Sequence, residues 1–320
     1  MMGAAPAIGG LGLMALSQVT ALWQFYGLWL VIGLMLSGSL YDACFSLITH
    51  ARGVQAKRGI VVITLVAGFA GTVSFPAVYY LSEAMGWRAA TALIGGFIAV
   101  AVAPLQWWGA RAVQAGRIAT PPAPETPQMA KNFLRRPAFW LLGLGIGMLA
   151  IVHGATLQHL LPLLNERGLP AEFAVLIAAL IGPMQVAGRV AMVATGRFLS
   201  HRDFMLIAFA VMAASVAVLL VSGDNRALLV AYVFLFGGAW GTVSILRPLI
   251  TRDILGERNF GAKSGSLALI FLTAAAASAY LGALIWGIGG YGLMLGVLIV
   301  LALAGATAFI AAQRLSQRGL

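Results

Sequence analysis

The chain has 320 residues, of which 61% are hydrophobic and only 9% charged, and its formal net charge is +11. An ordinary soluble domain is about 25% charged. A soluble fold exposes a large share of its surface to water, and a chain of this length could not bury so many apolar residues, so this composition excludes a soluble globular protein. The basic residues stand singly between apolar runs, which argues against a nucleic-acid-binding surface, where they would gather on one face.

The apolar runs have the length of membrane-spanning helices. About 20 residues of helix cross a hydrocarbon core of about 30 Å, and the alternating segments of a membrane β-barrel are absent from the sequence. Ten segments qualify, at 2–22, 25–49, 59–82, 89–109, 138–164, 172–196, 203–222, 227–250, 264–286 and 291–312. We therefore expect an all-α polytopic membrane protein with about ten transmembrane helices.

A long polar stretch divides these segments into four and six. It runs from 111 to 137 and contains the sequence TPPAPETP, which is a poor helix former and is typical of a semi-rigid extended linker. The predicted organisation is an incomplete four-helix bundle at 1–110, a cytoplasmic linker at 111–137 and a six-helix bundle at 138–320.

The distribution of Lys and Arg predicts the orientation of the chain. Fifteen fall on one side of the predicted spans, namely Arg52, Lys57, Arg58, Arg111, Arg117, Lys131, Arg135, Arg136, Arg197, Arg202, Arg252, Arg258, Lys263, Arg314 and Arg318. The other side has only Arg88, Arg167 and Arg226. Because basic loops stay in the cytoplasm, the first side is predicted to be cytoplasmic, together with both termini.

The two halves of the sequence also contain an internal repeat. Leu47-Ile48-Thr49 recurs as Leu249-Ile250-Thr251 at the end of another predicted span, and Gly86-Trp87 is matched by Gly290-Tyr291 in the next external loop. The offsets are 202 and 204 residues, so helices and loops recur in the same order and orientation. Such parallel repeats are typical of one large class of secondary transporters.

On these features the sequence resembles the major facilitator superfamily, whose members have six plus six helices and a basic central linker. The resemblance implies that the first four spans correspond to family helices three to six, so the first two would be missing. The family loop G-x-x-x-D-R-x-G-R-R would then precede Met1, and its second-half counterpart is reduced to Gly196-Arg197 with His201-Arg202, without the expected acidic residue. A fragment, a start codon placed too far downstream and a truncated gene are all compatible with this arrangement.

Shorter pieces are similar to the monocarboxylate-transporter-like bacterial branch of that family. They are Tyr41-Asp42 with Phe45, Gly68-Phe69-Ala70 leading to Phe75-Pro76, Gly86-Trp87-Arg88, His159-Leu160-Leu161-Pro162, and Gly182-Pro183 through Gln185 to Gly188-Arg189. This resemblance implies transport of a small organic acid, driven by protons or by a counter-substrate. Gly68, Gly71 and Pro76 only loosely match the family's antiporter signature, so proton symport and exchange both stay open.

Asp42 is an acidic residue that lies inside a predicted span and away from its ends. A charge near the middle of a spanning helix costs about 2.5–3.5 kcal/mol on insertion scales, and Asp42 shares a polar and small stripe with Ser39, Ser46 and Thr49. Such a stripe faces protein or water. Asp42 is therefore either a substrate or proton site, or a structural acid bonded to a neighbouring helix.

Two arginines also lie inside predicted spans. Arg189 follows Gln185 by one helical turn and is the best candidate for holding a carboxylate. The alternatives are that it pairs with Asp42 to lock a closed state, or that it extends to the cytoplasmic headgroups. Arg247 lies on a stripe with Trp240 and Ser244, near enough to the cytoplasmic end to reach the interface unaided.

His153, near the middle of its span, completes the candidate substrate or proton pathway of Asp42, Arg189, Gln185, Arg247 and His153. A histidine can carry a proton near neutral pH, but a packing role is equally common. His159 lies about 120° further around the helix, so the two do not form a metal pair. Repeated glycines such as Gly237 and Gly241 indicate close helix packing.

The sequence contains no phosphate-binding loop, no zinc-protease motif and no nucleophile elbow. We therefore predict no enzyme activity, no metal and no cofactor. The expected function is alternating-access transport of a small solute, such as a small organic acid, across a bacterial inner membrane. The alternatives are an exporter of hydrophobic drugs or metabolites and an inactive fragment.

Overall fold

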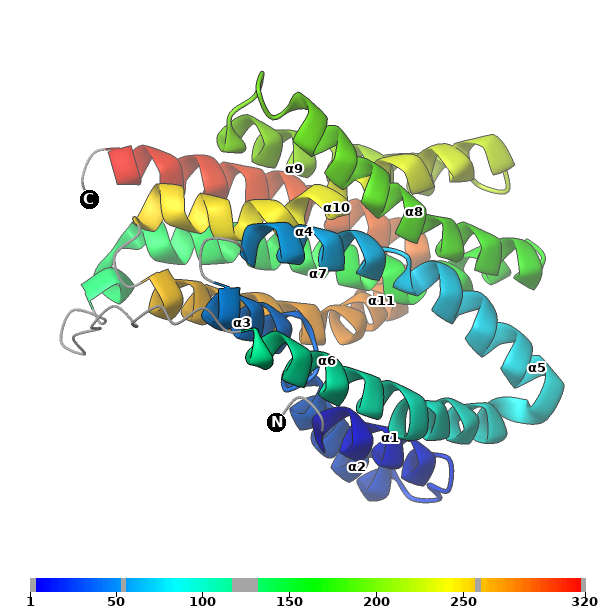
Figure 1. Ribbon diagram of the computed structural model, residues 1–320. Coiled ribbons are helices and arrows are strands. Elements are labelled where there is room, and N and C mark those ends of the chain that lie inside the picture. Colours follow the sequence, from blue (N-terminus) through cyan, green and yellow to red (C-terminus); the bar gives the residue numbers. More distant parts are fainter. Residues whose placement is uncertain (1–3, 53–55, 117–131, 257–259, 318–320) are drawn as a thin grey trace. The chain divides into compact units, whose positions relative to one another are not determined.

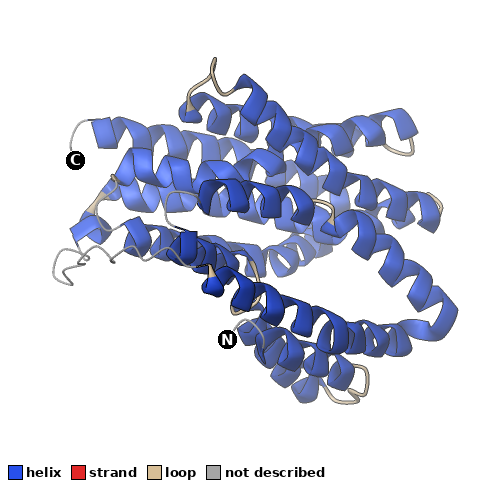
Figure 2. Ribbon diagram, in the orientation of Figure 1, coloured by secondary structure: helices blue, strands red, loops and turns tan. Residues whose placement is uncertain are grey.

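The computed structural model describes residues 4–52, 56–116, 132–256 and 260–317, and every regular element in these ranges is a helix (Figures 1 and 2). The chain forms two compact units. The N-terminal unit comprises Met1–Ala67 and Ser74–Ala123, and the C-terminal unit comprises Gly68–Val73 and Pro124–Leu320. Most of the predicted linker, at 117–131, lies outside the described residues. The division into two bundles and a linker with the predicted boundaries stays a prediction.

The N-terminal unit is built from short helices. They are α1 (Ala4–Leu16), α2 (Leu22–Ser37), α3 (Tyr41–Arg52), α4 (Ala56–Ala67), most of α5 (Ala70–Phe97), the π-helix η2 (Ile98–Val102) and α6 (Ala103–Ala115). Glycine lets α1 and α5 approach closely, because a Cβ on Gly10 would lie only 2.6 Å from the carbonyl oxygen of Gly95. Such small-residue contacts are the usual way in which membrane helices pack.

Two predicted spans are interrupted in the structure. Residues 38–40 form a turn between α2 and α3, and residues 68–69 form a turn between α4 and α5. The first turn leaves the carbonyl of Ser39 outside the regular helical pattern, and the Gln106 side chain of α6 donates to it at 2.7 Å. Because the backbone polar group finds this partner within the protein, an irregular turn is tolerated in an apolar surrounding.

The C-terminal unit consists mainly of long helices. They are α7 (Pro137–Glu166), α8 (Ala171–Thr195), α9 (His201–Val221), α10 (Arg226–Leu255) and α11 (Phe260–Gln317), preceded by the 3-10 turn Asn132–Arg135. Local sequence explains where they begin. Pro137 occupies the first turn of α7, Ser200 and Asp203 form a capping box at α9, and the Asn225 side chain accepts from the first backbone N–H groups of α10.

The 58 residues of α11 are not one straight helix. A straight helix of that length would measure about 87 Å, nearly three times the hydrocarbon core. Gly289 and Gly290 break it, and Gly290 has a φ of +68°. Lys263 and Ser316, near its two ends, both donate to carbonyls at the C-terminus of α10. The chain therefore reverses at Gly290, and Figure 1 shows the orange and red halves ending on the same side of the C-terminal unit.

The same glycine conformation recurs in the N-terminal unit. Gly86 interrupts α5 with a φ of +78°, a region that favours glycine. The internal repeat matches Gly86 with Gly290, and both fall between predicted spans. Their shared conformation supports the repeat in three dimensions.

In the described residues, six helical stretches are long and apolar enough to cross a membrane. Two of them contain the reversals at Gly86 and Gly290. Val62–Ala115 covers most of the predicted span 59–82 and all of 89–109, and Phe260–Gln317 covers all of 264–286 and 291–312. Ala4–Leu16 and Leu22–Ser37 are shorter apolar helices. The prediction of an all-α polytopic membrane protein is confirmed, while the total of ten spans and the cytoplasmic termini stay predictions.

Candidate functional site

The crossing of α8 and α10 organises the interior of the C-terminal unit. A Cβ added to Gly241 would lie 2.1 Å from the carbonyl oxygen of Gln185, and one added to Gly188 would lie 2.2 Å from that of Gly238. The two backbones touch there, and glycine is required on both helices. The packing function predicted for Gly237 and Gly241 is confirmed, since Gly237 likewise lies against Met184 of α8.

Arg189 lies at this crossing and is buried, with 3% of its surface exposed. Its Nε donates to the carbonyl oxygen of Gly241 at 3.2 Å, and the Ser244 hydroxyl donates to the same oxygen at 3.0 Å. A guanidinium that extended to the headgroups would be exposed in this structure. Its burial therefore places the Arg189 side chain inside the C-terminal unit and not at the surface of the protein.

His153 enters the same region from α7. Its ring stacks on Trp240, with centroids 3.6 Å apart and planes 6° apart, and on Phe236, with centroids 5.1 Å apart and planes 7° apart. The side chain is 9% exposed, and its Nε2 has no hydrogen-bond partner among the described residues. An imidazole nitrogen buried without a hydrogen-bond partner costs free energy.

Arg247 extends the aromatic series toward α11. Its guanidinium carbon lies 4.0 Å from the centroid of Phe271, a cation–π geometry. The Phe271 ring in turn stacks on Trp240, with centroids 6.1 Å apart and planes 19° apart. Because Arg247 is half-buried against an aromatic face, it is held inside the protein at least in part.

Four of the five predicted site residues thus meet one segment of α10, residues 236–247. Gln185 and Arg189 contact it from α8, His153 contacts it from α7, and Arg247 belongs to it. Sequence reasoning missed Phe236 and Phe271. The spacing of Phe236 and Trp240, one helical turn apart, was an available signal for the first, whereas Phe271 stands in a uniformly apolar run.

The fifth residue, Asp42, lies in the first turn of α3, directly after the turn at 38–40. Its side chain lies outside the described residues. The predicted pairing of Asp42 with Arg189 therefore stays a prediction.

Two further sequence motifs meet within the C-terminal unit. The Thr72 hydroxyl, in the stretch Gly68–Val73, donates to the carbonyl of Ala179 on α8 at 3.0 Å. A Cβ on Gly182 would lie 2.7 Å from the carbonyl oxygen of Gly68, so glycine is required for this contact. The pieces around Gly68 and around Gly182 therefore form one packing contact.

Long apolar helices with a buried arginine and histidine between them define an integral membrane protein with a polar interior. The family model of the Major Facilitator Superfamily matches residues 1–265. The chain belongs to the Major Facilitator Superfamily, a family of membrane transporters, and is not an enzyme. No curated protein matches the chain.

Solved structures share the fold. A bacterial homologue of the human lysosomal transporter Spinster, in an inward-facing and unoccupied conformation, aligns with a TM-score of 0.57 and 15% identity over 98% of this chain and 81% of its own. The same transporter in an inward-facing and occupied conformation aligns with a TM-score of 0.54 and 16% identity, over 99% of this chain and 81% of its own. At this identity the similarity shows the fold alone.

Proposed function

We propose that this protein is a secondary active transporter that moves a small organic anion across a bacterial inner membrane by alternating access. The family supports transport, and the bacterial origin of the similar solved structures supports the location. In this proposal the regions 1–110 and 138–320 are the two bundles that move in the alternating-access cycle, and the linker at 111–137 joins them. Protons or a counter-substrate drive the cycle.

The observation that supports an anionic substrate is the balance of charged residues in the predicted spans. Two guanidinium groups, Arg189 and Arg247, lie inside predicted spans, against one carboxylate, Asp42, that is not the first residue of its span. The acidic residues that the structure describes in the C-terminal unit lie at helix ends or in connections, at Glu166, Glu172, Asp203, Asp224 and Asp253. One positive charge in excess is costly in a low-dielectric interior, and a bound monoanion neutralises it.

The residues have separate functions in this proposal. Arg189 binds the carboxylate, because a guanidinium holds two oxygens at once, and Gln185 adds a hydrogen bond one turn away. Arg247 supplies the second positive charge. Asp42 and His153 are the titratable groups through which proton movement is coupled to the cycle.

The test is uptake of labelled acetate, lactate and benzoate into proteoliposomes, with and without an inward proton gradient. We expect gradient-dependent uptake of at least one acid, a loss of at least tenfold in Arg189→Gln, and partial recovery in Arg189→Lys. Arg197→Gln is the matched control, because Arg197 is exposed and its guanidinium rests on Phe198. Equal uptake by Arg189→Gln and the parent protein would contradict this assignment.

The aromatic series of His153, Phe236, Trp240 and Phe271 favours one alternative, an exporter of hydrophobic compounds on the same fold. Aromatic faces bind neutral or cationic compounds as well as anions. Efflux of a neutral aromatic dye from preloaded right-side-out vesicles separates the two functions. An exporter should retain this efflux in Arg189→Gln and lose it in Trp240→Ala.

A further inference from the structure

An open groove of about 430 Å³ runs along α2 in the N-terminal unit. Its lining begins with Gln18 and Val19, in the connection between α1 and α2, and continues along α2 through Trp23 and Gly27 to Val31. From Trp23 to Val31 the groove follows about 12 Å of helix. Pockets that bind small molecules have volumes in this range. This groove is polar at the connection and apolar further along α2.

Arg88 lies at the polar end of the groove. Its Nη2 donates to the carbonyl of Val19 at 2.9 Å, and its guanidinium carbon lies 4.5 Å from the ring centroid of Trp87. The reversal at Gly86 therefore lies beside the connection between α1 and α2. Glu83, the acidic residue nearest to Arg88 in the sequence, makes no ion pair with it in the structure. Arg88 is exposed, so its guanidinium retains N–H groups that can bind a further acceptor.

Gln24 provides a second donor at the same end. Its Oε1 accepts from the backbone N–H groups of Thr20 and Ala21, at 3.0 and 3.2 Å. Because both partners are donors, they fix which side of the amide is the oxygen and leave Nε2 as a donor. That Nε2 makes no hydrogen bond within the part of the chain that the structure describes. A guanidinium and an amide N–H group therefore both lie at the polar end of the groove.

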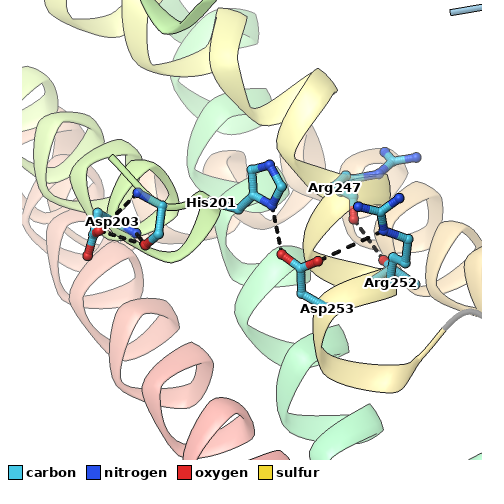
Figure 3. A network of polar contacts seen from close by, with 7 residues as sticks. His201, Asp203, Arg247, Arg252 and Asp253 are labelled. Carbon is cyan, nitrogen blue, oxygen red and sulfur yellow. Dashed lines mark hydrogen bonds and ion pairs between the residues drawn. The ribbon is translucent and has the colours of Figure 1, made fainter. Parts of the chain in front are cut away.

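Charged groups at other helix ends are bound within the protein. Where α9 begins and α10 ends, His201 Nδ1 lies 2.7 Å from Asp253 Oδ2 (Figure 3). Near the end of α9, the guanidinium of Arg167 donates to three oxygens at 2.9–3.3 Å. Arg88, by contrast, has the carbonyl of Val19 as its one acceptor among the described residues. It therefore has the donors that a bound anion requires.

We propose that this groove binds an anionic phospholipid, with the phosphate at Arg88 and Gln24 and an acyl chain along α2. A guanidinium can hold two phosphate oxygens at once, and Arg88 carries the positive charge that complements the headgroup. Trp23 and Trp87 are 74% and 53% exposed, and tryptophan is typical of the level of the headgroups. With the predicted orientation, the lipid belongs to the outer leaflet.

A phospholipid satisfies both parts of the groove at once. Its phosphate supplies acceptors for Arg88 and Gln24, and its chain covers the apolar lining at Gly27, Leu28 and Val31. An apolar helix of a second copy of the chain would cover the lining but leave the donors without acceptors, which costs free energy. A soluble anion would leave the apolar lining uncovered. Charge and apolar surface together therefore favour the lipid.

The test is native mass spectrometry of the full-length protein in detergent, mixed with equal amounts of phosphatidylglycerol and phosphatidylcholine that have the same acyl chains. We expect one phosphatidylglycerol to be retained about three- to tenfold more often than phosphatidylcholine, between the effects of an exposed ion pair and of a hydrogen bond to a charged group. Arg88→Gln should remove this preference, and Arg88→Lys should retain part of it. Arg226→Gln is the matched control, because Arg226 is also exposed, also rests on an aromatic ring and is predicted to lie on the same side of the membrane.

Gly27→Leu tests the acyl chain separately from the headgroup. A Cβ on Gly27 meets nothing within 4 Å, so the leucine can extend into the groove without a clash. It should lower the retention of both lipids at least about fourfold, which corresponds to one CH₂ group that is no longer buried. Gly33→Leu is the matched control, because a Cβ on Gly33 of α2 also meets nothing within 4 Å and Gly33 is not part of the lining.

Three results would overturn the proposal: equal retention of the two lipids, equal effects of Arg88→Gln and Arg226→Gln, or equal effects of Gly27→Leu and Gly33→Leu. A dimer in the mass spectrum that Gly27→Leu dissociates would show that a second copy covers the groove, and it would also overturn the proposal. The substituted residues are exposed, so the variants should fold, which size-exclusion chromatography checks. The measurement requires no transport substrate.

Discussion

Replacing Gly241 with alanine tests the helix crossing on which the candidate site depends. The new Cβ would lie 2.1 Å from the carbonyl oxygen of Gln185, which is 1.3 Å short of the 3.4 Å at which ordinary van der Waals contact begins. The obstacle is backbone and not a flexible side chain, so α8 and α10 must move apart. The bond from Arg189 Nε to the Gly241 carbonyl, now 3.2 Å, would lengthen with that movement.

The expected cost follows from two contributions. Overpacking of this kind costs about 1–3 kcal/mol, and a hydrogen bond from a charged donor contributes about 1.5–3 kcal/mol. The higher helix propensity of alanine relative to glycine offsets about 1 kcal/mol of this loss of stability. A net destabilisation of about 1.5–5 kcal/mol therefore remains, and at about 2–4 °C per kcal/mol the unfolding temperature should fall by at least about 3 °C.

Gly238 provides the matched control on the same helix. A Cβ at Gly238 meets nothing within 4 Å, so Gly238→Ala gains helix propensity without a clash. Thermal unfolding in detergent, followed by tryptophan fluorescence, should place Gly241→Ala below the parent protein and Gly238→Ala at or above it. Equal unfolding temperatures for the two variants would refute the close crossing, and with it the geometry that holds Arg189.

Three further variants test other parts of the structure. Arg167→Ala should lower the unfolding temperature, because the guanidinium beyond the end of α7 donates to Leu219 O, Ser222 Oγ and Gly223 O at 2.9, 3.0 and 3.3 Å. Burial lowers the pKa of Arg167, but arginine stays protonated in proteins, so the fall in unfolding temperature should be equal at pH 6 and pH 9. A fall that depends on pH would contradict this assignment. His153→Phe keeps a ring against Phe236 and Trp240 and removes the buried Nε2. The unfolding temperature should therefore be unchanged or higher, while uptake of the labelled acid falls. Unchanged uptake would show that His153 is not part of the substrate or proton pathway. Gln106→Leu deletes the 2.7 Å bond to the Ser39 carbonyl and should cost about 1–3 kcal/mol, whereas the neighbouring exposed Leu105→Ala should change the unfolding temperature little.

The sequence alone determined the class of protein and most of its helices. A helix surrounded by lipid needs an apolar run long enough to cross the hydrocarbon core, and such a run can be identified in the sequence without knowledge of long-range contacts. The reversals were also local. Gly86 and Gly290 adopt positive φ values between predicted spans, because glycine tolerates this conformation where other residues do not.

The interruptions of the predicted spans were not local. The turn at 38–40 is possible because Gln106, far along the chain, binds the carbonyl of Ser39. The pattern of apolar residues does not carry such a partner. Composition therefore predicts that a segment lies in the membrane, but tertiary contacts decide whether its helix is continuous.

The candidate site shows the same division. The sequence predicted Arg189, Arg247 and His153 as candidate site residues, because each is a polar residue in an apolar run and is costly in lipid unless it lies inside the protein. Their meeting along residues 236–247 of α10, the aromatic faces of Phe236 and Phe271, and the partnership of His201 with Asp253 emerged only in three dimensions. The physical reason is that periodicity places a side chain on one face of its own helix, whereas packing between distant helices decides which other side chain that face meets.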